Sequence, residues 1–153
     1  MRKEFNREKT KDVAIGLSSI LADSYTLYLM TQNFHWNVTG PRFHQLHTMF
    51  EEQYQELAEA VDDIAERIRA IGHRAPGSFK EFMEISSIDG SEKTEKTQDM
   101  LERLAESHEL ISSKAYEVIE MADSIKDEVT KDLLTGRMNI HEKSAWMLRS
   151  QLD

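Results

Sequence analysis

The sequence contains no cysteine, only two prolines and only six glycines. Without cysteine, the chain has no disulfide, no thiol catalysis and no thiolate metal ligand. Any metal ion must therefore be bound by His, Asp and Glu side chains, which suits iron, manganese or zinc, and zinc could replace iron in crystals. The scarcity of proline and glycine permits long helices along almost the whole chain.

Long apolar runs are also lacking, and no stretch approaches the roughly 20 residues that span a bilayer. The N-terminal sequence MRKEFNREKTK is charged and is not followed by an apolar signal segment, so we expect a cytoplasmic protein with no membrane partner. With 39% hydrophobic and 31% charged residues, the composition is typical of one soluble globular domain. We expect this domain to cover residues 1–153, with 1–8 as a short N-terminal tail.

Apolar residues recur with the helical period in four long segments. The predicted long helices span about 9–37, 42–71, 97–122 and 127–152, and a short helix is expected at 78–85 in the long connection. Gly40 and Pro41 end the first helix, and Gly72 is expected to cap the second. This pattern predicts an all-α, ferritin-like four-helix bundle, with a short extra helix between its second and third long helices.

Ferritin-like bundles that bind two iron ions in their core use Glu-x-x-His pairs, which bring both side chains to one face of a helix. None of the six histidines has Glu three positions before it. The residues found there are Gln32, Pro41, His44, Ala70, Ala105 and Met138. The sequence therefore argues against an ordinary di-iron site inside the bundle.

A different set of potential metal ligands lies on the first two helices: His35, His47, Glu51, Asp62 and Glu66. At about 100° per residue, the last four share one flank of the second helix, beside its apolar stripe. His35 can approach His47, because the turn at 37–41 folds the two helices together.

Distance divides these ligands into two half-sites. His47 and Asp62 are 15 residues apart, which is roughly 22 Å along a straight helix, whereas metal–ligand bonds are about 2 Å long. One chain cannot bring both side chains to the same ion. A two-fold axis near Tyr54 and Gln55 would place His47 of one copy opposite Asp62 of another and give two equivalent sites per dimer.

An ordinary structural interpretation is also open. A histidine near a helix end is usually a cap or a surface residue, and the acidic residues of 62–66 with Arg67 and Arg69 are compatible with a solvated face of i,i+4 pairs. On this interpretation the chain is a helical interaction protein. We expect the remaining histidines at the surface or in interfaces: His44, His73, His108 and His141.

Three motifs carry a resemblance to a known family. HWNVTG (35–40), LH (46–47) and DDIAER (62–67), in this order, resemble the Dps family (DNA protection during starvation). The resemblance is strongest between 25 and 77 and extends over essentially the whole chain, including WML at 146–148. It implies a hollow shell of twelve subunits that oxidises Fe(II), preferably with hydrogen peroxide, deposits ferric mineral inside and protects against oxidative stress.

The resemblance also implies ligands. The ferroxidase site of the family corresponds to His35 and His47 of one subunit and to Asp62 and Glu66 of its two-fold partner, so the chain would be an oxidoreductase with a di-iron site shared between subunits. Glu51 stands where many members carry Asp, and it could bind iron directly or through water.

Four further residues have proposed functions in the family. Trp36, beside His35, is placed there to quench stray oxidants, whereas its ordinary interpretation is aromatic packing. Acidic residues at the junction of the last two helices line three-fold pores that admit iron, which implies pore functions for Asp123, Asp127 and Asp132. The ordinary interpretation of Asp127, and of its neighbour Glu128, is a charge favoured by the helix dipole.

DNA binding is the main alternative function. Some Dps proteins bind DNA through a long Lys/Arg tail, but the first eleven residues here hold only five basic residues against two acidic ones. With a net charge of −9 per chain, the protein repels DNA phosphates, and we expect weak or no binding at physiological salt. The alternative is a nucleoid-associated DNA-binding protein in which iron sequestration is secondary.

Overall fold

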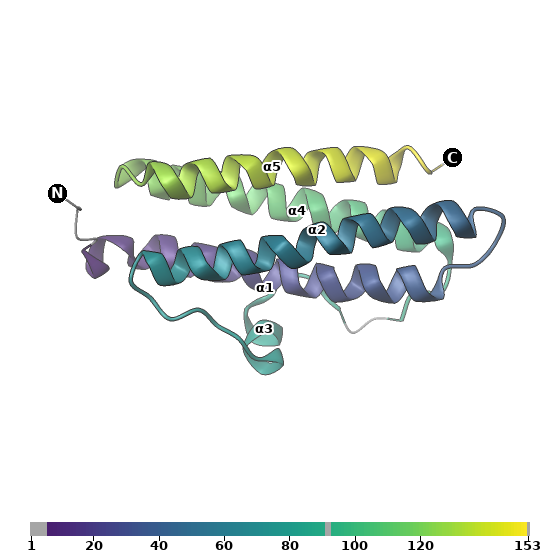
Figure 1. Cartoon of the computed structure of the whole chain (residues 1–153), viewed down its shortest axis with the longest axis horizontal. Coiled ribbons are helices and arrows are strands. Elements are labelled where there is room, and N and C mark those ends of the chain that lie inside the picture. The colour runs from purple at the N-terminus through teal and green to yellow at the C-terminus, as the bar shows by residue number, and fades with distance from the viewer. Residues whose placement is uncertain (1–5, 91–92, 153) are drawn as a thin grey trace.

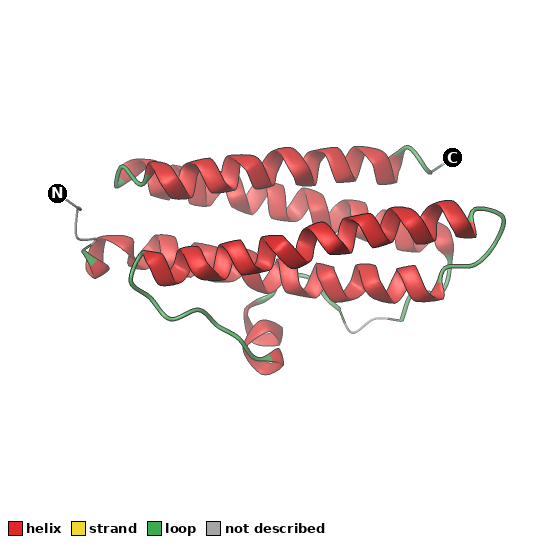
Figure 2. Ribbon diagram, in the orientation of Figure 1, coloured by secondary structure: helices red, strands yellow, loops and turns green. Residues whose placement is uncertain are grey.

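The computed structural model describes residues 6–90 and 93–152. They form five helices: α1 (Arg7–Asn37), α2 (Phe43–Ala70), α3 (Phe79–Ile85), α4 (Thr97–Ser124) and α5 (Glu128–Arg149). No strand occurs in these ranges, and the helices begin and end close to their predicted bounds, which confirms the all-α class (Figure 2). The tail is shorter than expected, because Asn6 accepts a hydrogen bond from the Glu8 N–H at 3.0 Å and caps α1. The rest of the expected tail, 1–5, lies outside the described residues.

The four long helices lie side by side in a bundle, with α3 outside it (Figure 1). One antiparallel hairpin consists of α1 and α2, and the other of α4 and α5. Since α2 and α4 run in the same direction, the connection between them must return along the bundle, and it carries α3 on the way. This confirms the predicted bundle with one crossover.

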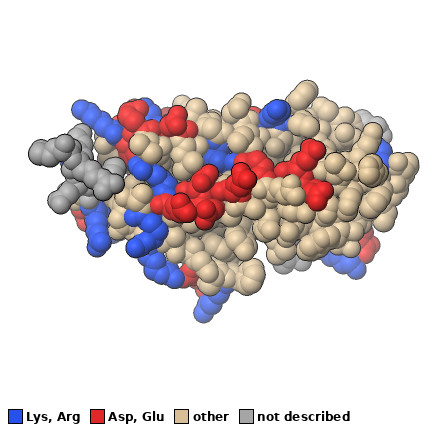
Figure 3. Space-filling model, in the orientation of Figure 1, with Lys and Arg blue, Asp and Glu red and all other residues tan. Residues whose placement is uncertain are grey.

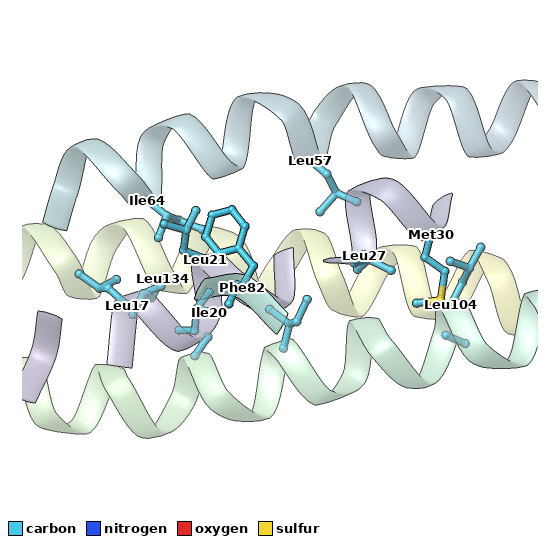
Figure 4. Packing of buried hydrophobic residues seen from close by; sticks show 14 of the residues in the cluster. Leu17, Ile20, Leu21, Leu27, Met30, Leu57, Ile64, Phe82, Leu104 and Leu134 are labelled. Atoms are coloured by element: carbon cyan, nitrogen blue, oxygen red, sulfur yellow. The ribbon is translucent and has the colours of Figure 1, made fainter. Parts of the chain in front are cut away.

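Aliphatic side chains from all four long helices form the core (Figure 4). Leu17, Leu57, Leu104 and Leu134, one from each helix, are no more than 1% exposed. Burial of one such side chain contributes about 1.5–3 kcal/mol. Gly16 permits the close approach of α1 to α4, because a Cβ at this position would lie 2.6 Å from Val118 Cγ2.

The apolar character of α1 comes from its central place in the bundle. An 18-residue stretch of this helix has a mean hydropathy of 1.4, so by length and composition alone it could cross a membrane. In the folded chain, 56% of that stretch is buried inside the bundle. A helix that packs against several neighbours is apolar on most of its surface, and we interpret α1 as such a core helix.

Glycines end the first two helices at the predicted places. Gly72 follows α2 with a φ of 100°, and Gly40 has a φ of 104° in the turn after α1. The Gly72 N–H donates to the Arg69 carbonyl at 3.0 Å, and the His73 N–H donates to the Ile68 carbonyl at 3.1 Å. These are the two bonds of a Schellman motif, in which glycine is favoured because the backbone is left-handed.

A buried carboxylate holds the crossover against the bundle. Asp23 of α1 is 0% exposed. It accepts hydrogen bonds from Lys114 Nζ of α4 at 2.5 Å, from Ser86 Oγ at 2.8 Å and from the Ser87 N–H at 2.7 Å. Because a buried carboxylate requires such partners, these bonds fix the segment that follows α3 to both α1 and α4.

A second buried carboxylate fixes the start of α5 to α2. Asp127 Oδ1 accepts hydrogen bonds from the Thr130 N–H at 3.1 Å and from Arg67 Nη2 at 2.7 Å. The side chains of Asp127 and Arg67 are 1% and 12% exposed. Asp127 is therefore both the cap of α5 and one half of a buried ion pair.

We predict that Asp127→Ala lowers the free energy of unfolding by about 2–5 kcal/mol, because it removes the cap and takes a carboxylate away from a buried arginine. Asp132→Ala, at an exposed position of the same helix, should change it by no more than about 0.5 kcal/mol. Guanidinium unfolding followed by circular dichroism, at one protein concentration for all variants, measures both. Equal effects of the two substitutions would contradict the assignment of Asp127 as cap and ion-pair partner.

Candidate functional site

The end of α1 and the beginning of α2 bring His35 and His47 together. Their rings stack, with centroids 3.8 Å apart and planes inclined by 11°. His35 Nδ1 is hydrogen-bonded to the His47 carbonyl at 2.6 Å, and His47 Nδ1 to the His35 carbonyl at 2.7 Å. Since a carbonyl oxygen can only accept, each Nδ1 carries a hydrogen, and Nε2 is the ring nitrogen left to offer a lone pair.

This reciprocal bonding is compatible with metal binding by both rings. Histidines that bind metals through one ring nitrogen usually donate the other N–H to a carbonyl or carboxylate, which fixes the tautomer and the ring orientation. Two aromatic neighbours restrict the pair further. Tyr54 presents its edge to His35 with centroids 5.2 Å apart, and Phe43 stacks on His47 at 5.0 Å.

The carboxylates of Asp62 and Glu66, the predicted second half-site, lie one helical turn apart on the exposed flank of α2. The negative charge of Asp62, together with a hydrogen bond between the two carboxyl groups, raises the pKa of Glu66. Two carboxylates that repel each other in this way favour the binding of a cation between them.

The two half-sites remain apart within one chain. α2 is one continuous helix from Phe43 to Ala70, so the 15 residues between His47 and Asp62 span roughly 22 Å. Within 6–90 and 93–152, no group of three or more His, Asp or Glu side chains is placed to hold a metal ion. Neither half-site therefore supplies three such ligands within the described residues.

Glu51 and Trp36 lie next to the histidine pair. Glu51 is half-buried and follows His47 by one turn of α2. Trp36 follows His35 and is 61% exposed, so it does not pack in the core of this chain. With Leu29 and Met83, Trp36 lines an open cavity of about 780 Å³ between α1 and α3.

Acidic side chains form a band along α2 (Figure 3). Glu52, Glu59, Asp62 and Asp63 are all exposed on this helix. A surface of one charge attracts counter-ions and raises their local concentration. The second half-site thus lies on a surface that favours divalent cations over nucleic-acid phosphates.

The acidic residues at the junction of α4 and α5 differ in their surroundings. Asp123 and Asp132 are exposed, as is Glu128, which precedes Asp132 by one turn of α5. Lys131 Nζ bonds to Asp123 at 2.6 Å and pairs with Glu128 at 3.4 Å. The bond to Asp123 is the main reason that the pKa of Lys131 is raised.

Asp127 departs from the expectation of a pore residue. It is 3% exposed, and its carboxylate caps α5 and pairs with Arg67. We therefore assign a structural role to Asp127 and consider Glu128 as the candidate pore residue in its place. Sequence analysis interpreted Glu128 as a charge favoured by the helix dipole and gave it no pore function, although its spacing of four residues from Asp132 puts both carboxylates on one face of α5.

Of the four histidines expected at the surface or in interfaces, His108 and His141 were predicted wrongly. His44 is exposed, and His73 is half-buried with its Nε2 2.9 Å from Thr10 Oγ1. By contrast, His108 and His141 are 2% and 0% exposed and contact each other in the bundle core. Helical periodicity places them on the inner faces of α4 and α5, a signal that sequence analysis did not use.

Comparisons with known proteins agree with the fold. The family model of the Ferritin-like domain matches residues 16–153. The chain is 41% identical to "DNA protection during starvation protein 2" of Bacillus anthracis over 143 residues, which cover 94% of this chain and 98% of that protein.

Solved structures give the same result. The fold superposes on Dps from Staphylococcus aureus with a TM-score of 0.90 at 35% identity, covering 94% of this chain and 96% of the other. It superposes on the DPS protein from Vibrio cholerae with a TM-score of 0.93 at 27% identity, covering 97% and 94% of the two chains. That protein is described as a member of a broad superfamily of ferritin-like diiron-carboxylate proteins, so the metal named there is iron.

Proposed function

The chain belongs to the ferritin-like domain family and, within it, to the Dps proteins, and we propose that it oxidises Fe(II) with hydrogen peroxide at a site shared by two copies of the chain. The product is stored as ferric mineral in a hollow shell. The observation that carries this proposal is the reciprocal bonding of His35 and His47, which leaves two imidazole lone pairs at one end of α2, far from the carboxylate pair at the other.

Two antiparallel copies of α2 complete the site. With a two-fold axis near the middle of the helix, His35 and His47 of one copy face Asp62 and Glu66 of the other, and the same contact occurs twice in the dimer. Glu51, one turn from His47, supplies a further carboxylate directly or through water. The resulting set of imidazoles and carboxylates suits iron.

The chemistry follows from the ligands. Carboxylates stabilise Fe(III) more than Fe(II), because the interaction grows with the charge of the ion. Two Fe(II) ions held close together each give one electron to a peroxide molecule, which takes up two protons and leaves as two water molecules. No hydroxyl radical is released when both electrons arrive together. Trp36, beside His35, is placed to donate an electron when only one iron ion is bound.

The proposed shell contains twelve chains and protects the cell by removing both Fe(II) and peroxide. We propose that iron enters at the exposed acidic residues of the α4–α5 junction: Asp123, Glu128 and Asp132. Their charges would attract cations to a pore on a three-fold axis, where three copies of each carboxylate meet.

DNA binding is the second candidate, and the name of the Bacillus anthracis relative favours it. The charges of this chain argue for weak binding, since an acidic band covers α2 and the net charge is −9. A gel-shift assay at rising salt separates the two candidates. Retention of a DNA complex at physiological salt would favour a nucleoid-associated protein.

We predict that His47→Ala and Asp62→Ala each abolish most ferroxidase activity and that co-assembly of the two variants restores part of it. In a mixed dimer one site carries both defects, whereas the other has its wild-type histidine and aspartate from different chains. Random mixing should therefore recover about a quarter of the wild-type activity. Stopped-flow Fe(II) oxidation measures the recovery in co-refolded shells.

Mass spectrometry must confirm that the mixed shells contain both chains. A mixture of two differently tagged His47→Ala chains is the matched control, and it should recover nothing. If all ligands came from one chain, every site in the mixed shell would be defective. Mixed shells as inactive as their parents would thus exclude a shared site.

We predict that hydrogen peroxide oxidises bound Fe(II) faster than dioxygen does, with fewer spin-trapped hydroxyl radicals than free iron produces. Trp36→Phe should leave the oxidation rate almost unchanged but increase the radical yield when one Fe(II) is added per site. Spin-trap EPR with matched iron and peroxide concentrations measures the yield. An unchanged yield in the variant would remove Trp36 from the mechanism.

We predict that Glu128→Gln combined with Asp132→Asn slows iron uptake at low salt and that the difference shrinks above about 0.1 M salt, where the Debye length falls to about 10 Å. The matched control, Glu106→Gln with Glu117→Gln, removes the same charge from exposed positions of α4. Iron uptake is followed by absorbance of the ferric product. Equal slowing by both double variants would show that total charge, and not this junction, steers iron.

A further inference from the structure

The centre of the bundle contains a polar cluster that the proposed shared site does not use. Its members are Glu56 of α2, His108 of α4, and Arg137 and His141 of α5. Arg137, His108 and His141 are 4%, 2% and 0% exposed, whereas the side chain of Glu56 is 36% exposed and forms the outer edge of the cluster. The cluster thus places a carboxylate, two imidazoles and a guanidinium where ferritin-like bundles with an internal di-iron site hold their metal ions.

One nitrogen atom of Arg137 bridges two potential metal ligands. Its Nη2 lies 3.0 Å from Glu56 Oε1 and 2.9 Å from His141 Nε2. The second guanidinium nitrogen, Nη1, donates to Glu56 Oε2 at 2.5 Å. A positive charge between a carboxylate oxygen and an imidazole nitrogen is the arrangement of a bound metal ion, although a metal would lie nearer to both, at about 2 Å.

The hydrogen bonds determine both imidazole tautomers. Arginine can only donate, so His141 Nε2 must be the acceptor and carry no hydrogen. His141 then donates from Nδ1 to His108 Nδ1, which lies 2.8 Å away. His108 therefore holds its hydrogen on Nε2. A ligand nitrogen on one side of a ring and an N–H donated on the other is the pattern of metal-binding histidines.

Charge and burial keep the two imidazoles neutral. Burial, followed by the charge of Arg137, lowers the pKa of His108 to about 3. Burial, His108 and Arg137 together hold the pKa of His141 well below its usual value. At neutral pH the lone pair of His141 Nε2 is therefore not protonated. It accepts the hydrogen bond from Arg137 instead.

The cluster also has unused hydrogen-bonding capacity. Among the described residues, four buried side-chain atoms lack a hydrogen-bond partner: Ser24 Oγ, Gln53 Oε1, His108 Nε2 and Arg137 Nε. Two of these belong to the cluster, and Gln53 precedes Glu56 by one turn of α2. Gln53 and Glu56 therefore share one face of α2.

We propose that the guanidinium of Arg137 is a built-in cation that fills a latent divalent-metal site, formed by Glu56 and His141 and supported by His108. The group is permanently charged and covalently attached, so a metal ion can bind only if it displaces a side chain from the core. The chain thereby differs from bundles with an internal di-iron site. While Arg137 is present, these residues cannot hold the metal ions of such a site. The proposed function explains why exclusion of iron is useful, but the latent site is testable without it.

The test is Co(II) binding to assembled protein, followed by visible absorption and equilibrium dialysis. Arg137→Ala should bind about one more Co(II) per chain than wild type, with the absorption of an oxygen- and nitrogen-ligated ion. Arg137→Lys keeps a positive charge and should bind no extra ion. Arg137→Ala combined with His141→Leu should lose the extra ion. Arg67→Ala removes another buried arginine, paired with Asp127, and should not gain one.

These outcomes are independent of the shared site, because any Co(II) bound there is present in wild type and in all variants. A folded Arg137→Ala shell that binds no additional Co(II) would overturn the proposal. If this variant does not fold alone, Co(II) added during refolding should restore its helix content in circular dichroism. A variant that stays unfolded with Co(II) present would also overturn it.

Discussion

The unbroken course of α2 separates the two ends of the helix. Backbone hydrogen bonds hold His47 and Asp62 roughly 22 Å apart, and no side-chain movement closes that distance. The histidine end can obtain a ligand only from α1, through the short turn that follows Asn37. Within residues 6–90 and 93–152, no further His, Asp or Glu joins the carboxylate end to make a group of three. The proposed division of the site, its two-fold symmetry and the value of an oligomer all follow from the stiffness of one helix.

Much of this fold could be predicted from sequence, because the dominant signals are local. Apolar periodicity defines the four long helices, and Gly72 ends α2 through a left-handed backbone that other residues adopt at a cost. The half-sites also follow from spacing along one helix. The reciprocal bonds of His35 and His47 could not be predicted, since they depend on where two carbonyl groups lie after α1 and α2 have packed.

The residues assigned incorrectly share one cause. A search for Glu-x-x-His examines one helix at a time, whereas Glu56, His108 and His141 come from three helices and meet only in the folded bundle. Asp127 received its expected pore function from the resemblance, whereas its position before α5 and its contact with Arg67 make it a cap and an ion-pair partner. In both cases tertiary packing converts residues that are polar, and therefore expected outside, into buried parts of the structure.

A site divided between the two ends of a helix has a consequence for timing. A newly synthesised chain that has folded but not yet paired holds two imidazoles and two carboxylates that cannot act on the same ion. Under the proposed function, such a chain would meet iron and peroxide without starting redox chemistry. Oxidation would then begin only when the concentration of chains is high enough for pairing, so that the onset of the proposed activity would be coupled to the assembly of the proposed shell.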